Sequence, residues 1–245
     1  MDVEKHELQQ KAEFWISKNG ICQDMETSIM KYAKLRLQKG RDVDIEHLLH
    51  ILPSTLGKSI KEHICFPLLK KVPLFQNMDE GVYRTICEFL KPVIYSEKSY
   101  IIREGEPLDM VLFITQGVVW TFGSNTSLTN RLQKGDYYGN ELIEWRFNSI
   151  SYNNFPLSIA NVKSQTKVEA FALMEIELKH VLYICWPKFY KYNKTNESIS
   201  GSMNYFAAAS LQRGFRRFIK NKKAQENKGQ ENKTRENEHS IHVNS

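Results

Sequence analysis

The first seventy residues carry apolar side chains at the spacing of helices. Two helical faces repeat at this spacing, one with Leu8, Ala12, Trp15 and Ile16 and one with Met25, Ile29, Tyr32 and Leu35. We expect the first helix to stop at Asn19-Gly20 and the second at Lys39-Gly40. A short third helix is predicted from Asp42 or Asp44 to His50, and a fourth from Pro53-Ser54 to about Lys71. Short helices with no closed core of their own indicate an interface element.

After Pro73 the pattern changes in two steps. Residues 75–90 fit one more helix, with Asn77 or Asp79 near its start. Beyond Pro92 the apolar period shortens to about two, which is typical of strands. The predicted strands cover residues 93–95, 100–102, 110–115, 118–122 and 168–173, with a tight hairpin at Gln116-Gly117 and a second turn at residues 104–107. The sequence therefore predicts an α+β chain in which a helical linker precedes an antiparallel, jelly-roll-like β-roll with flanking helices.

The C-terminal third returns to helix and then loses its core pattern. A helix from Glu175 is expected to break at Trp186-Pro187, because proline removes a donor and clashes with the preceding turn. The segments predicted along the whole chain are a helical linker (1–72), the roll (73–185), a loop or broken lid helix (186–203), an amphipathic helix (204–223) and a disordered tail (224–245).

Composition places the chain among globular proteins. It has 245 residues, of which 41% are hydrophobic and 25% charged. No apolar run is long enough to span a bilayer, and the N-terminus lacks a secretory segment. Of the net charge of +6, the segment from Arg213 onward supplies +5, with nine basic and four acidic residues. A nearly neutral body argues against a nucleic-acid-binding face.

Metal and catalytic chemistry find little support in the sequence. The four scattered cysteines indicate reduced thiols, and no histidine or cysteine lies between Lys91 and Ala172 to build a metal site inside the roll. His47 and His50 form a pair without a third ligand. No nucleophile stands beside a plausible base, so we expect no enzyme, no catalytic residues and no metal.

The segment Leu132-Gln133-Lys134-Gly135-Asp136-Tyr137-Tyr138-Gly139-Asn140-Glu141-Leu142 is the most informative in the chain. Two glycines four residues apart, just before a helical stretch, can turn backbone N–H groups toward an anion. Gly135 and Gly139 fit equally well as turn residues that the roll needs with or without a ligand.

With this segment, the chain resembles the cyclic-nucleotide-binding domain at the cytoplasmic C-terminal end of plant cyclic-nucleotide-gated channels. Three further stretches carry the resemblance: Ile51-Leu52-Pro53 with Ile64-Cys65, Lys71-Val72-Pro73-Leu74-Phe75 with Met78-Asp79, and Val168-Glu169-Ala170-Phe171-Ala172-Leu173. They are similar to the family's linker, the entry to its roll and its exit strand. By the resemblance, pore-forming membrane helices precede Met1, and this chain lacks them.

The family resemblance also implies a nucleotide site, and this sequence departs from the family's motif at two positions. A glycine approaches the cyclic phosphate, a glutamate holds the ribose hydroxyl, and an arginine neutralises the phosphate. Gly139 matches, but Asn140 stands at the glutamate position beside Glu141, and Ala160 stands at the arginine position. The candidate residues for cyclic nucleotide are Tyr138, Gly139, Asn140, Glu141, Leu142, Ser158, Ala160 and Asn161. Because a lost buried charge partner costs about 2 to 5 kcal/mol of binding, we expect weak binding at best.

The amphipathic segment after the roll resembles an IQ motif, which recruits calmodulin in the same family. Its candidate residues are Leu211, Gln212, Phe215, Arg216, Arg217 and Phe218. A basic amphipathic helix suits the acidic, methionine-lined groove of calmodulin. The same helix could instead pack on the roll or lie on an anionic membrane surface.

The resemblance implies a regulatory region of a cyclic-nucleotide-gated-type cation channel, which couples nucleotide sensing and calmodulin binding to gating. The alternative is a pore-less adaptor that binds calmodulin or channel subunits and no nucleotide. We expect calmodulin and full-length channel subunits as partners, the latter through the linker helices, at the cytoplasmic face of a membrane. No cofactor is expected beyond cAMP or cGMP as a possible ligand.

Overall fold

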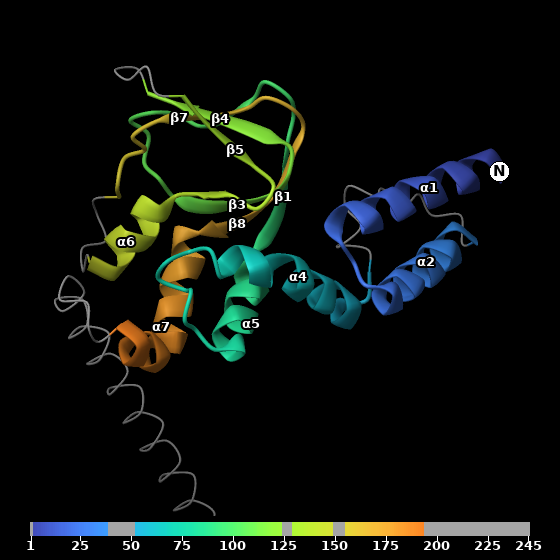
Figure 1. The fold of residues 1–245 in the computed structure, drawn as a ribbon, viewed down its shortest axis with the longest axis horizontal. Helices are drawn as coiled ribbons and strands as arrows, with labels where there is room; N and C mark the ends of the chain where they lie inside the picture. The colour runs from blue at the N-terminus through green and yellow to red at the C-terminus, as the bar shows by residue number, and fades with distance from the viewer. Residues whose placement is uncertain (1, 39–51, 124–128, 149–154, 194–245) are drawn as a thin grey trace, which may run out of the picture.

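The computed structural model in Figure 1 describes residues 2–38, 52–123, 129–148 and 155–193. The chain begins with helices α1 (Asp2–Asn19), α2 (Gln23–Gln38) and α4 (Ser54–Leu69). α1 ends as predicted at Asn19, and Gly20 follows with φ of +64° while its N–H donates to the Ser17 carbonyl. The third helix predicted before His50 lies outside the described residues.

The N-terminal helices bury a small apolar cluster, contrary to the expectation that they have no core of their own. We call it the linker cluster, and its buried members are Ile16, Ile21, Ile29, Leu52 and Ile60. Ile64 on α4 packs against both the linker cluster and the main core. In Figure 1, α4 runs from the pair α1 and α2 toward the roll.

Helix α5 (Glu80–Phe89) starts later than the predicted Phe75. The Asp79 side chain accepts from the Val82 N–H at 3.0 Å and so caps the helix. Residues 73–77 before it form turns. The Tyr83 hydroxyl lies 2.8 and 3.1 Å from the carbonyl oxygens of Phe75 and Gln76, which share its proton. The prediction of a helix from Phe75 is therefore wrong over its first turn.

Two antiparallel four-stranded sheets form the roll, with strand orders β1-β8-β3-β6 and β2-β7-β4-β5. The strands are β1 (Lys91–Tyr95), β2 (Tyr100–Ile102), β3 (Met110–Gln116), β4 (Val118–Phe122), β5 (Thr129–Gln133), β6 (Tyr137–Tyr138), β7 (Asn161–Ser164) and β8 (Val168–Met174). The predicted α+β roll is confirmed, although the sequence pattern did not reveal β5, β6 and β7. The predicted hairpin at Gln116-Gly117 is wrong, because β3 pairs with β8 and β6 whereas β4 pairs with β7 and β5. At Gly117 the chain passes from one sheet to the other with φ of +90°, and an added Cβ would lie 2.4 Å from the Lys167 carbonyl oxygen.

Helices α6 (Asn140–Asn148) and α7 (Glu175–Asn193) cover the roll on the side of α5 (Figure 1). The predicted break at Trp186-Pro187 is wrong, because α7 continues through Pro187 to Asn193. Trp186 and Phe189 are buried against Phe147, with ring centroids 6.5 and 5.3 Å away. This aromatic packing on both sides of Pro187 offsets the lost backbone bond.

Within the residues that the structure describes, no helix combines the length and apolar character needed to cross a membrane.

Candidate functional site

The glycine-rich segment forms the turn from β5 through β6 into α6, and backbone bonds fix it against the central strand β3. The Gly135 N–H donates to the Ile114 carbonyl and the Ile114 N–H to the Asp136 carbonyl, both at 2.9 Å. The Asp136 carboxylate accepts from the Gln133 N–H at 2.9 Å. The turn is therefore built by the backbone of β3 and by one local carboxylate. We call the turn and the strap facing it, residues 135–142 and 155–161, the cradle.

Gly139 is the residue on which the shape of the cradle depends. Its φ is +103°, and an added Cβ would lie 2.8 Å from the Met110 carbonyl oxygen and 3.2 Å from the Val111 Cα. Only glycine combines this backbone conformation with so close an approach. The structural role of Gly139 follows from this packing without any ligand.

Asn140 begins α6, and its amide is occupied by its neighbours. The Tyr137 hydroxyl donates to its Oδ1 at 3.2 Å, and its Nδ2 donates to a Glu144 carboxylate oxygen at 2.5 Å. The amide therefore faces a carboxylate where the resemblance implies a ribose hydroxyl.

The electrostatics at this end of the cradle are negative. Burial first, and then the nearby carboxylates Glu144 and Glu141, raise the pKa of Tyr137. Burial also raises the pKa of Tyr138. The hydrogen bond to Ser158 lowers this pKa, and the charge of Glu141 raises it further. A carboxylate that raises a neighbouring phenol pKa would also repel a phosphate.

Ser158 lies opposite the turn and joins the strap to β6. Its hydroxyl and that of Tyr138 are 2.8 Å apart, and the Ser158 hydroxyl donates to the Ala160 carbonyl at 2.7 Å. The Ser158 backbone bonds to the turn at Gly105 and Glu106 through 2.8 Å hydrogen bonds. The structure thus brings the candidate residues Tyr138, Ser158 and Ala160 together.

Asn161 lies at the C-terminal end of the strap. Its Oδ1 accepts from the Glu104 N–H at 3.3 Å, and its Nδ2 donates to the Glu104 carboxylate at 3.3 Å and to the Phe122 carbonyl at 3.4 Å. Asn161 therefore holds the turn before β3 to the end of β4. It shares no hydrogen bond with Tyr138 or Ser158 in the described part of the chain.

Leu142 is fully buried, and its N–H donates to the Gly139 carbonyl at 3.1 Å. Across the described ranges, the side-chain hydrogen bonds of the candidate residues involve no lysine or arginine side chain. The side chains bonded to the candidate residues are therefore neutral or acidic.

Sequence reasoning missed Glu144 and Glu104 as partners of this site. Glu144 stands four residues after Asn140 on a helix, a spacing that places two side chains on one face and could have been recognised. Glu104 lies 57 residues from Asn161, and only the fold joins them.

Two other predictions concern metals and the amphipathic segment. The described residues contain no group of three or more histidine, cysteine, aspartate or glutamate side chains able to hold a metal ion. The segment with Leu211, Gln212, Phe215, Arg216, Arg217 and Phe218 lies outside the described residues.

Comparison with known proteins finds relatives among plant channels. The chain is 37% identical over 225 residues to the probable cyclic nucleotide-gated ion channel 6 of Arabidopsis thaliana, which covers 88% of the chain and 30% of the relative. It is 35% identical over 231 residues to the Arabidopsis cyclic nucleotide-gated ion channel 1, again over 88% of the chain. It is 41% identical over 175 residues to the putative channel 13, over 69% of the chain and 25% of that relative. The chain thus spans about a third or less of these relatives. No family model matches it.

Proposed function

Because the chain is a homologue of one region of the plant cyclic nucleotide-gated ion channels, we propose that it is a regulatory region of a channel of this type. The roll with α5, α6 and α7 is the sensor unit, and α1, α2 and α4 are the linker through which channel subunits associate. The region acts without catalysis at the cytoplasmic face of a membrane, as part of a channel assembly. The observation that carries this proposal is the cradle at Gly139, built into a roll homologous to that of the channels.

The cradle of this chain binds cyclic nucleotide weakly. Helix α6 begins directly after Gly139, and the backbone N–H groups of its first turn favour an anion. Ala160 offers no charge to the phosphate, and Glu141 and Glu144 place negative charge beside the turn. A charge-assisted bond to phosphate is roughly twice as strong as a neutral one, so its loss dominates the balance.

We propose calmodulin as a partner of the segment 204–223. Its basic residues Arg213, Arg216 and Arg217 give electrostatic attraction to an acidic groove, and its apolar residues give the buried area. Charge reversal at Arg216 and Arg217 in the full chain should abolish calmodulin binding measured by calorimetry. Retained binding would contradict this assignment.

The pore-less adaptor stays a second candidate because of one observation. The Asn140 amide, at the position of the ribose contact, already bonds Tyr137 and Glu144. A ligand would have to displace the contact with Glu144. An adaptor that recognises proteins and no nucleotide needs no such displacement.

Calorimetry with cAMP and cGMP distinguishes the two candidates. We compare the natural chain with Ala160→Arg, which restores a cation at the strap, and with Ala160→Gln, which adds length without charge. A working cradle predicts weak binding by the natural chain and affinity at least about tenfold higher for Ala160→Arg than for Ala160→Gln. If neither variant produces heat while the fold is intact by circular dichroism, the sensor proposal fails and the adaptor remains.

A further inference from the structure

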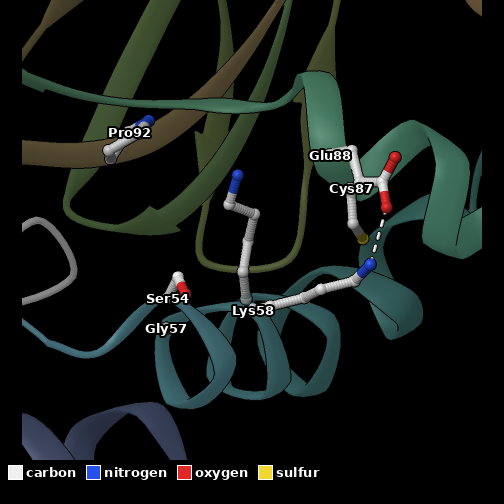
Figure 2. Close-up of a pocket in the computed structure, with 7 residues that line it drawn as sticks. Ser54, Gly57, Lys58, Cys87, Glu88 and Pro92 are labelled. Carbon is white, nitrogen blue, oxygen red and sulfur yellow. Dashed lines mark hydrogen bonds and ion pairs between the residues drawn. The ribbon is translucent and has the colours of Figure 1, made fainter.

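A cavity lies outside the cradle, where the linker meets the roll. Its volume is about 300 Å³, within the range of small-molecule sites. Figure 2 shows the cavity between α4 on one side and α5 with the start of β1 on the other. Its lining residues are Ser54, Gly57, Lys58, Lys61, Cys87, Glu88 and Pro92. None of them belongs to the cradle.

One face of α4 supplies the polar groups of this cavity. Ser54, Lys58 and Lys61 follow one another at intervals of four and three residues, which places them along a single stripe of a helix. Two ammonium groups and a hydroxyl therefore line one wall. The opposite wall adds the thiol of Cys87 and the ring of Pro92, which are largely apolar.

Lys61 is the group whose charge is least compensated. Its ammonium is half-buried and donates to the Leu90 backbone carbonyl at 2.8 Å. Within the described residues it has no carboxylate at ion-pair distance. Partial burial lowers its pKa, as expected when water is removed from a cation that no anion replaces. An anionic ligand would relieve this loss of solvation.

Lys58 stands at the rim of the same cavity in an exchangeable ion pair. Its ammonium lies 2.6 Å from the Glu88 carboxylate, and both side chains are about half exposed. Exposed ion pairs of this kind add little stability, so an incoming anion can replace the carboxylate. Glu88 is thus an internal competitor for any anionic ligand.

We propose that this cavity at the junction of α4 and α5 binds a small molecule through a phosphate group. Lys61 contacts the buried phosphate oxygens, and Lys58 exchanges Glu88 for the ligand. A phosphate suits two ammonium groups one helical turn apart, because its several oxygens accept from both. The volume leaves room for a small polar body beside the phosphate. The site rests on residues of α4 and α5 and is independent of the proposed nucleotide cradle.

The ligand chemistry could come from a free phosphorylated metabolite or from a lipid headgroup. Two titrations of the full chain distinguish these sources: calorimetry with myo-inositol monophosphate, and cosedimentation with phosphatidylcholine vesicles with or without phosphatidylinositol monophosphate. Binding of the soluble probe alone supports a free metabolite, and binding of both probes supports a lipid headgroup. Binding of neither overturns the proposal.

Three variants test where the phosphate binds. Lys61→Gln should weaken binding at least about tenfold, because a charge-assisted contact is lost. Glu88→Gln should strengthen it several-fold by removing the competitor. Lys31→Gln, on the exposed surface of α2, is the matched control and should leave affinity unchanged.

The outcome that contradicts the proposal is equal weakening by Lys61→Gln and Lys31→Gln, which would indicate nonspecific attraction to basic residues. Lys61→Gln could fail to fold because the Leu90 carbonyl loses its donor. In that case the phosphate affinity of Glu88→Gln still tests the proposal. This surface substitution keeps the side-chain shape, and an unchanged affinity would overturn the assignment of the site.

Discussion

At the scale of single residues, Gly139 is held by two independent constraints. Its backbone lies at positive φ, and a side chain would meet the Met110 carbonyl oxygen of β3 at 2.8 Å. Gly105 shares only the first constraint, since its φ is +79° and an added Cβ would meet nothing within 4 Å. A comparison of Gly105 with Gly139 therefore separates the effect of positive φ from the effect of crowding by neighbouring atoms.

We expect Gly105→Ala to lower the free energy of unfolding by about 1 to 2 kcal/mol, the cost of a left-handed conformation for an L-residue. Gly139→Ala should cost a further 1 to 3 kcal/mol, roughly, because β3 must shift to admit the methyl group. Urea denaturation followed by circular dichroism measures both. Equal losses would show that β3 yields freely at this point.

How far the sequence predicts such residues depends on whether the cause is local. Gly117 and Gly139 lie in local sequence patterns that are typical of turns, so both were expected to be turn residues. The hydrogen bonds from Asn161 to Glu104 and Phe122 join residues brought together only by sheet pairing. Such a contact has no local signal in one sequence.

At the scale of elements, Arg146 connects α6 to α7. Its guanidinium is 3.1 Å from the Glu175 carboxylate, and its side chain is only 2% exposed. Arg84 on α5 gives a matched comparison, because it pairs with Glu80 at 3.1 Å and with Glu62 at 3.5 Å but is 55% exposed. The two arginines therefore differ strongly in burial.

Arg146→Met should lower the free energy of unfolding by about 3 to 5 kcal/mol, because it leaves the Glu175 carboxylate without its charge partner in a poorly solvated position. Arg84→Gln should change it by less than about 1 kcal/mol, since water replaces the lost contacts. Chemical denaturation of both variants provides the measurement. Similar losses would mean that burial does not govern the strength of these pairs.

The elements that the sequence predicts well are those with a strong apolar pattern. β3 is buried along nearly its whole length, and four of its residues, Val111 to Ile114, are apolar and fully buried. β5, with the sequence Thr-Asn-Arg-Leu-Gln, is largely exposed, and β6 has two residues, so neither gives a period. In α7 the local rule against proline fails because buried aromatic residues around Pro187 hold the helix in place. In α7, tertiary packing therefore overrides the local sequence signal.

At the scale of the whole molecule, the linker cluster and the core of the roll differ greatly in size. The linker cluster buries five side chains, whereas the main core extends from Cys65 on α4 through both sheets to Phe189 on α7. Opening a small cluster exposes less apolar surface and costs less free energy.

We therefore expect backbone amides in the middle of α1 to exchange with deuterium at least about tenfold faster than those of β3. Hydrogen exchange with mass spectrometry on the full chain measures both. Equal protection would show that the linker helices and the roll open as one cooperative unit.

Helix α4 contributes to both apolar clusters. Ile60 lies in the linker cluster, and Cys65, Leu68 and Leu69 lie in the main core. At 16 residues it is roughly 24 Å long, with the rise of an α-helix. It therefore connects the linker cluster to the core of the roll, and it contacts α5 along the way. For a helix of this length, a tilt of a few degrees would move the far end by about 1 to 2 Å, so a change at one cluster would shift the other.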